Sequence, residues 1–281
     1  MLCMASVVAS RLIAIVVGCS SAACNPAKSP AASSQPSASL QATATLPAMV
    51  DATAFIGDEN PALPDAGPTV STPIKIVDWP ITWPAHRDAL MLEYRRTHSD
   101  PAAQDLTIVP RVIVLHYTAG GSAKATKNYF DNLTIEPSRT QLYAAGSVNV
   151  SAHFLVDRDG TMYRLMPETT MARHCIGLNH DAIGIENVGD EAKIKLTDAQ
   201  VAANIALVRY LKARYPTITH LLGHFEVMRF TKEPMFVELD PTFRNDKPDP
   251  GPRFMALVRG GLRDLKLHGL AAHDNSVDRE P

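Results

Sequence analysis

The sequence is poor in several features that would have pointed to other classes of protein. It has 281 residues and a formal net charge of only -2, so no strong basic field draws it to nucleic acid. It has no apolar run long enough to span a bilayer as a mature helix and no visible internal repeat. Its size suits one globular domain plus segments that do not fold, and we expect a monomer that does not bind nucleic acid.

Cysteine is also scarce in the part of the chain that can fold. Three of the four cysteines, Cys3, Cys19 and Cys24, lie near the N-terminus, and only Cys175 lies further on. A disulfide within the mature domain is therefore excluded, so the domain must be stabilised by its core and by any bound metal. We expect Cys175 to be a buried structural thiol rather than a nucleophile, because its neighbour His174 would face the opposite way on an extended chain.

The N-terminus has the order of an export signal, with one basic residue at Arg11, then an apolar stretch, then small residues and cysteine. The signal peptide is predicted at 1–18. Residues 16–19 (VVGC) resemble the lipobox of bacterial lipoproteins, in which the signal is cut before a cysteine that then carries the lipid. Several acyl chains on Cys19 would hold the protein stably on a membrane. An ordinary cleaved signal and a misplaced start codon are the alternatives, and Cys24 is a competing, poorer lipid site.

A tether is expected between this anchor and the folded part. Residues 19–73 are dominated by Ser, Ala, Pro and Thr in their first half, and such a stretch buries too little apolar surface to offset the entropy of ordering. Ser20 follows Cys19, where aspartate is associated with retention in the inner membrane. We therefore expect an exported outer-membrane lipoprotein that faces the periplasm. The folded domain is predicted at 74–270, followed by a C-terminal tail at 271–281.

The segment 74–270 alternates strand-like and helix-like patterns. A continuous apolar run predicts a buried strand at 111–118, and 182–188 is predicted as another strand. The clearest helix is 196–215, because Thr197 and Gln200 form a capping-box pattern before apolar residues at helical spacing. The other predicted elements are a helix at 122–132, a hairpin of 152–156 with 162–166, a strand at 217–222 and a helix at 252–267. A hairpin together with helical crossovers predicts an α/β fold, a single domain with a central mixed β-sheet flanked by helices.

Two histidines and one aspartate lie where α/β domains place catalytic groups. His116 ends the first buried strand, His224 follows the strand at 217–222, and Asp249 lies in a turn-rich segment before the last helix. Two neutral imidazoles and a carboxylate leave a fourth tetrahedral position for water, as a catalytic zinc requires. With 10 histidines in the chain and no compact H-E-x-x-H motif, unrelated histidines are the alternative on spacing alone.

A carboxylate and a cation are predicted beside this trio. Side chains alternate along the strand at 182–188, so Glu186 points to the face that has only Gly184 beside it. Lys247 lies two residues before Asp249 in an extended, proline-constrained stretch, so both side chains can project the same way. Taken alone, Glu186 would be interpreted as a surface ion-pair partner and Lys247 as a solvated loop lysine.

Six motifs together resemble those of the zinc-dependent N-acetylmuramoyl-L-alanine amidases of the type 2 family, which share a fold with the peptidoglycan recognition proteins. They are VIVLHYTAG (112–120), SAHFLVDRDGTMYRL (151–165), RHCIGLN (173–179), AIGIENVG (182–189), LLGHFE (221–226) and KPDPGPRF (247–254). The resemblance covers nearly the whole domain in the right order. It implies one zinc ion bound by His116, His224 and Asp249, with Glu186 and Lys247 as catalytic residues.

The reaction that this resemblance implies is hydrolysis of the amide between N-acetylmuramic acid and L-alanine, in cell-wall remodelling or turnover. Glu186 would take a proton from water and deliver it to the leaving amine, and zinc with Lys247 would stabilise the oxyanion. The expected partners are peptidoglycan or muropeptides, and the membrane through the lipid on Cys19. The alternatives are a non-catalytic peptidoglycan-binding envelope protein of the same fold and a zinc peptidase that cuts within the stem peptide.

Three further residues are candidates for contact with the substrate, namely His174, Tyr117 and Asn128, and Tyr129 and the segment 143–150 could also line the groove. His174 matches a histidine that many relatives carry in W-H-x-G, but here Arg173 replaces the aromatic residue. A structural hydrogen-bonding role for His174 is therefore equally open. His153 is expected to be a buried hairpin histidine rather than a ligand. The segment 226–246 is an insertion, apolar enough either to pack over the groove and shape substrate choice or to extend the core.

Overall fold

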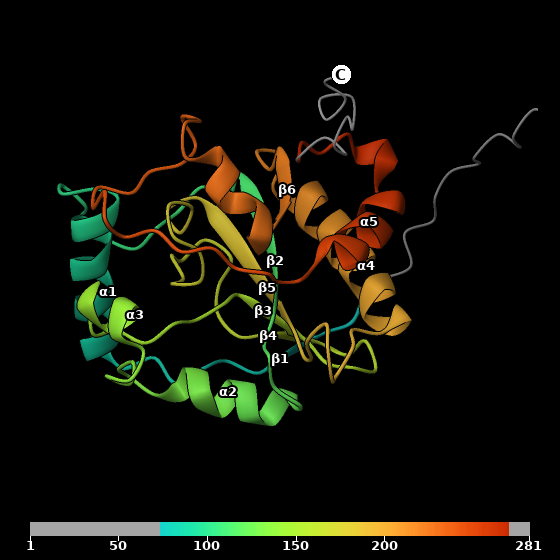
Figure 1. The fold of residues 1–281 in the computed structure, drawn as a ribbon, viewed down its shortest axis with the longest axis horizontal. Helices are drawn as coiled ribbons and strands as arrows, with labels where there is room; N and C mark the ends of the chain where they lie inside the picture. Colours follow the sequence, from blue (N-terminus) through green and yellow to red (C-terminus); the bar gives the residue numbers. More distant parts are fainter. Residues whose placement is uncertain (1–73, 270–281) are drawn as a thin grey trace, which may run out of the picture. The chain divides into compact units, whose positions relative to one another are not determined.

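The apolar run that predicts a strand buried on both faces forms β2 (Val112–Tyr117), in a six-stranded sheet (Figure 1). The computed structural model describes residues 74–269. Strand β2 pairs in parallel with β5 (Ala182–Asn187) on one side and with β6 (His220–Gly223) on the other. The first four residues of β2 have no exposed surface. The three predicted central strands are confirmed.

The other half of the sheet contains the predicted hairpin. β3 (Phe154–Val156) pairs in parallel with β5 and antiparallel with β4 (Met162–Arg164), and β1 (Ile76–Asp78) completes the sheet beside β4. The strand order is β1-β4-β3-β5-β2-β6, so the sheet is mixed, as predicted. β1 was not predicted from the sequence. The predicted signal peptide at 1–18, the linker at 19–73 and the tail at 271–281 lie outside the described residues.

Two helices cover one face of the sheet through an apolar interface. α4 (Asp198–Arg214) begins with the predicted capping box of Thr197 and Gln200, and it packs with α5 (Pro252–Gly260) on the same side (Figure 1). The main core lies between these helices and the strand residues that face them, including Ile113, Leu115, Ile183 and Ile185. The last helix is shorter than predicted. It ends at the two glycines 260–261, and a short 3-10 turn, η2 (Arg263–Leu265), follows.

The opposite side of the sheet carries α1 (Ala85–His98), α2 (Ala123–Asp131), the short α3 (Thr140–Ala144) and the 3-10 helix η1 (His224–Phe230). The helix predicted at 122–132 is α2, which Ser122 caps. α1 was missed for a physical reason. The residues that it buries are Arg87, Met91, Tyr94 and His98. An arginine and a histidine thus take two core-facing positions, and they interrupt the apolar periodicity that identifies a helix.

The insertion at 226–246 is fixed against α1. Nδ1 of His98 lies 2.8 Å from Oε1 of Glu238, and Nε2 of His98 lies 2.7 Å from the backbone oxygen of Ala145. Phe243 is buried with the apolar residues of α1, and Phe236 packs beside them. Of the two predicted roles of the insertion, the extension of the core is confirmed.

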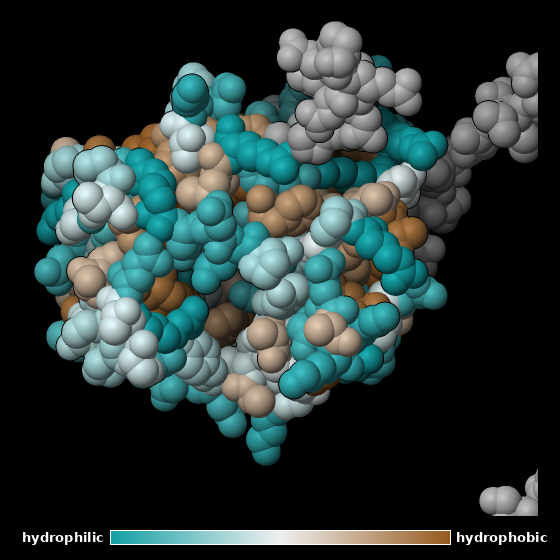
Figure 2. All heavy atoms as spheres, viewed as in Figure 1, coloured by the Kyte–Doolittle hydropathy of each residue, from teal (hydrophilic) through white to brown (hydrophobic). Residues whose placement is uncertain are grey.

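Apolar side chains are largely confined to the interior. Figure 2 shows a mostly hydrophilic surface in the view of Figure 1, with hydrophobic residues in separate patches. Within residues 74–269, no helix combines the length and the apolar character needed to cross a membrane.

A buried ion pair joins η1 to α5 just beyond the end of β6. The carboxylate of Glu226 accepts from Nη1 and Nη2 of Arg259 at 2.7 and 2.6 Å, and Oε2 also accepts from the backbone N–H of Gly223 at 2.8 Å. The Glu226 side chain is only 3% exposed. An unpaired carboxylate there would lose both its hydration and its counter-charge.

We therefore expect Arg259→Met to lower the free energy of unfolding by about 3 kcal/mol, because it leaves the Glu226 carboxylate buried and unpaired. Urea denaturation of the metal-free protein measures this change. The matched control is Arg209→Met, which breaks the ion pair with Asp264, whose side chains are 41% and 59% exposed. The control should cost less than about 1 kcal/mol. Equal effects of the two substitutions would contradict the role given to Glu226.

Candidate metal centre and substrate cavity

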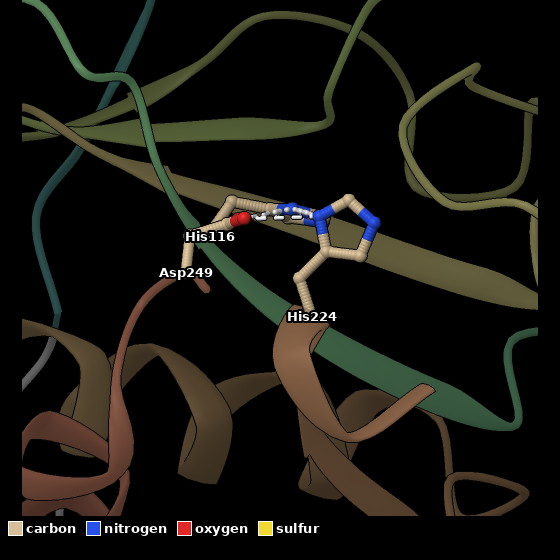
Figure 3. A group of neighbouring side chains, drawn as sticks. All are labelled: His116, His224 and Asp249. Atoms are coloured by element: carbon tan, nitrogen blue, oxygen red, sulfur yellow. Dashed lines mark hydrogen bonds and ion pairs between the residues drawn. The ribbon is translucent and has the colours of Figure 1, made fainter. Parts of the chain in front are cut away.

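The three predicted ligands converge at one edge of the sheet (Figure 3). The Nδ1 atoms of His116 and His224 are 3.0 Å apart, and Oδ2 of Asp249 lies 3.1 Å from the first and 3.2 Å from the second. His116 comes from β2, His224 from the first residue of η1, and Asp249 from the loop before α5. The structure thus brings together all three residues that the sequence singled out as ligands.

Parallel strand pairing positions these groups. Leu115 of β2 pairs with Gly223 of β6, so His116 and His224 are the residues that follow a matched pair of neighbouring strands. The backbone N–H of Phe225 donates to the backbone oxygen of Asp249 at 2.9 Å, which attaches the third ligand's loop to η1. Carboxyl ends of parallel strands meet at one edge of a sheet, and this edge is where α/β folds build their sites.

The donor set fits a metal ion. Tetrahedral zinc with bonds of about 2.0–2.1 Å requires ligand atoms about 3.3 Å apart, close to the three distances between these ligand atoms. Burial and the neighbouring His224 lower the pKa of His116 to about 4, so its imidazole is neutral, the form that binds a metal. Burial alone would raise the pKa of Asp249, but its contacts with the imidazoles of His116 and His224 hold that pKa well below its usual value. Asp249 is therefore an anion at neutral pH.

Glu186 lies beside this trio on the face that the sequence predicted. The register of β2 and β5 pairs it with His116. Its Oε2 is buried and has no hydrogen-bond partner among the residues that the structure describes. Burial, with the nearby charge of Asp249, raises the pKa of Glu186 to about 8. Glu186 can therefore carry a proton near neutral pH.

One cavity of about 470 Å³ connects these groups. Both predicted catalytic residues, Glu186 and Lys247, line it with the three ligands, and so does Tyr117. Asn128 does not: it lies exposed on α2, while its neighbour Tyr129 lines the cavity. The expectation that Asn128 contacts substrate therefore finds no support in the cavity's lining.

The cavity is also lined by residues outside the predicted metal, catalytic and substrate-binding set. They are Tyr94, Arg139, Leu142, Arg173, Ile176, Phe243 and Asn245. Phe243 and Asn245 belong to the insertion, so the insertion shapes the cavity as well as extending the core. Phe243 carried a signal as an apolar residue of the insertion, and Arg173 and Ile176 lie in the motif at 173–179. Arg139 carried none.

Arg173 stands where many relatives carry tryptophan, and it is a structural guanidinium. Nη1 donates to the backbone oxygens of Gly146 and Val148 at 2.9 and 2.5 Å, and Nη2 donates to that of Leu142 at 2.6 Å. Its guanidinium carbon lies 4.4 Å from the ring centroid of Tyr94. Arg173 therefore holds the segment 142–148 in place as a wall of the cavity.

Of three motif residues near the site, His153 and Cys175 are buried and His174 is half-buried. His153 has no exposed surface, accepts from the backbone N–H of Gly184 at 3.0 Å, and burial lowers its pKa to about 4. Cys175 is a buried free thiol whose pKa burial raises well above its usual value. Both expectations are confirmed. His174 lines the cavity, but its Nδ1 lies 3.0 Å from Nε2 of His116 and its Nε2 lies 3.3 Å from the backbone oxygen of Ala182. It thus has no free ring nitrogen for a substrate.

Comparison with known proteins finds amidases among the similar sequences and structures. The chain is 29% identical over 167 residues to the 1,6-anhydro-N-acetylmuramyl-L-alanine amidase AmpD of Salmonella typhimurium, covering 53% of this chain and 81% of that protein. It is 29% identical over 168 residues to AmpD of Citrobacter freundii, with the same shares of each chain. The solved structure of the N-acetylmuramoyl-L-alanine amidase LysC from Clostridium intestinale URNW is 26% identical, with a TM-score of 0.43, and covers 68% of this chain and 99% of its own.

A protein family described as N-acetylmuramoyl-L-alanine amidase matches residues 106–252. That stretch is more than half of the 281 residues, and it contains the three converging ligands together with Glu186 and Lys247. The chain therefore belongs to the N-acetylmuramoyl-L-alanine amidase family.

Proposed function

We propose that the protein is a zinc-dependent hydrolase that cleaves the amide between N-acetylmuramic acid and L-alanine in peptidoglycan or its fragments. The observation that carries the proposal is the buried Oε2 of Glu186, which has no hydrogen-bond partner among residues 74–269, beside a three-ligand metal site. A structural zinc is closed by four protein ligands, whereas a catalytic zinc keeps one position for water or substrate. Family membership supplies the reaction and the substrate class.

The roles of the residues follow from their places in the cavity. Zinc, when bound, supplies a Lewis acid for water and for the substrate carbonyl, and a positive charge next to Glu186. Glu186, with its pKa raised by burial to about 8 in the metal-free protein, takes a proton from water and passes it to the leaving amine nitrogen. Lys247 lines the same cavity two residues before Asp249, and its ammonium stabilises the developing oxyanion.

The charge of the cavity supports a substrate with carboxylates, as a stem peptide has. Arg139, Arg173 and Lys247 line it, and within residues 74–269 none of them has a carboxylate within ion-pair distance. Arg139 is half-buried and is oriented by its hydrogen bond to the hydroxyl of Tyr129 at 2.8 Å. A planar guanidinium with unused donors is suited to bind a carboxylate.

A non-catalytic peptidoglycan-binding protein of the same fold is the second candidate. It would need neither a complete set of metal ligands nor a buried carboxylate without a partner, because such a carboxylate lowers stability and adds nothing to binding. The site retains both. A zinc peptidase that cuts within the stem peptide would use the same groups, and only the products of the reaction distinguish it.

For the whole chain we propose an exported protein, anchored by lipid on Cys19 to the outer membrane and facing the periplasm, and monomeric. The support is the order of basic, apolar and small residues at 1–18, followed by cysteine. Residues 19–73 would be the tether, 74–270 the amidase domain and 271–281 a tail.

We expect Glu186→Gln to retain zinc and to lose about 10²- to 10⁴-fold in kcat, because the amide cannot carry the proton. Metal content by mass spectrometry and digestion of purified sacculi are the measurements. The wild-type protein should release intact stem peptides and leave peptide-free glycan. Unchanged sacculi with zinc bound would favour the binding protein, and cuts within the peptide would favour the peptidase.

Arg139→Ala should raise KM about tenfold or more for a muropeptide with a free peptide carboxylate, because one charge-assisted hydrogen bond is lost. The same muropeptide with its carboxylates amidated should bind equally to both proteins. Arg214→Ala, at the end of α4 and outside the cavity lining, is the control. A KM that rises equally for both substrates would show that Arg139 stabilises the cavity wall and does not bind the peptide carboxylate.

Cys19→Ala should abolish incorporation of labelled palmitate and release the protein from the membrane fraction into the soluble periplasm. Radiolabelling of growing cells followed by fractionation measures both. Cys24→Ala is the matched control and should leave lipidation unchanged. Lipid lost only in the Cys24 variant, or protein retained with an uncut signal in the cytosol, would overturn the proposed location.

A further inference from the structure

His174 bonds the ring nitrogen of His116 that is turned away from the metal site. Its Nδ1 lies 3.0 Å from Nε2 of His116, and the two rings are nearly perpendicular, at 88°. On its other side, Nε2 of His174 lies 3.3 Å from the backbone oxygen of Ala182. These two contacts engage both polar atoms of the side chain.

The contacts of His174 favour one tautomer of His116. A backbone oxygen only accepts, so Nε2 of His174 carries the hydrogen, and Nδ1 of this uncharged ring is an acceptor. Nε2 of His116 must then donate to it, which leaves Nδ1 of His116 as a lone pair. The opposite tautomer of His116 would donate from Nδ1 to Oδ2 of Asp249, 3.1 Å away, but it would set two lone pairs against each other at 3.0 Å between His116 and His174. The lone pair of His116 is thus directed at the position shared with His224 and Asp249.

The His174 ring fits at this place because residue 184 of the neighbouring strand is glycine. A Cβ on Gly184 would lie 2.7 Å from Cγ of His174, closer than a side chain tolerates. The backbone N–H groups of His174 and Cys175 both donate to Oδ1 of Asn179 at 2.8 Å. Behind the ring, His153 accepts from the backbone N–H of Gly184 at 3.0 Å. The His174 ring is therefore confined by neighbours on several sides.

We propose that His174 is a positioning residue for the metal: it holds His116 in the tautomer and ring orientation that present Nδ1 to zinc. Hydrogen-bond partners of ligating histidines act in this way in metal sites generally, and carboxylates or backbone oxygens usually fill that role. Here a second neutral imidazole fills it, with the carbonyl of Ala182 behind it. The proposal rests on the metal site of the proposed function and not on its substrate.

Two substitutions at the same position separate the hydrogen bond from the packing. In His174→Asn, the side-chain oxygen lies where Nδ1 lies and can still accept from His116, whereas His174→Leu has similar bulk and no acceptor. The dissociation constant of zinc, measured on the full-length protein by competition with a chromophoric chelator, should rise about 10- to 100-fold in the leucine variant. The asparagine variant should remain close to wild type.

The tautomer provides a readout that general loosening would not reproduce. In metal-free protein labelled with 15N-histidine, two-bond ring correlations should show His116 with hydrogen on Nε2 in wild type and in His174→Asn, and a mixture of tautomers in His174→Leu. The signals of His116 are assigned by their loss in His116→Asn. If His174→Leu does not fold, Gly184→Ala is the second variant, because its Cβ displaces the His174 ring without removing it.

If His174→Leu kept wild-type zinc affinity and an unchanged His116 tautomer, the proposal would be overturned. If only KM rose in that variant, His174 would be a substrate-contacting residue instead. Equal loss of affinity in the leucine and asparagine variants, with lowered unfolding midpoints in both, would also overturn it. Neither measurement uses substrate, so failure of the amidase assay would leave the result standing. A wild-type protein that binds no zinc would count against the proposed function itself.

Discussion

The parallel pairing of β2 with both β5 and β6 is the constraint on which the rest of the molecule depends. It places His116 opposite Glu186 and brings the residues that follow β2 and β6 to one edge of the sheet. A slip of one residue in either pairing would move a whole set of side chains to the other face. His116 would then lie in the apolar layer under α4 and α5. The site therefore needs this register as much as it needs its residue types.

The two faces of the sheet are stabilised by different means. Under α4 and α5 the core is mostly apolar, with one buried amide network, in which Gln200 donates to the backbone oxygens of Val156 and Val188 and Asn204 donates to Oδ1 of Asn187. On the side of the site, buried guanidiniums bind the backbone of irregular segments. Arg87 donates to the carbonyls of Thr82 and Phe130, and Arg173 donates to three carbonyls of the cavity wall. These directional bonds fix loops whose backbone groups are not paired in the sheet. An open cavity can therefore lie between the loops.

Periodicity and motif spacing predicted the central strands, the hairpin, α4 and the metal trio, because each depends on local chemistry or on strand ends that must meet. α1 could not be predicted in this way, since it buries Arg87 and His98 as core residues. The contact between His174 and His116 could not be predicted from the sequence either. Whether a motif histidine faces substrate or another histidine depends on the space above Gly184, which only tertiary packing defines. For the same reason the sequence could not separate Asn128, which is exposed, from Tyr129, which lines the cavity.

The state of Glu186 explains why the cations of the cavity are arranged as they are. Three basic side chains line the same space, and an ion pair with any of them would stabilise the Glu186 carboxylate and lower its pKa. A carboxylate stabilised in that way could no longer carry a proton near neutral pH. Arg173 is instead engaged by backbone carbonyls and Arg139 by the hydroxyl of Tyr129, and neither bonds Glu186. The fold accepts an unpaired buried carboxylate because the chemistry proposed for it requires one.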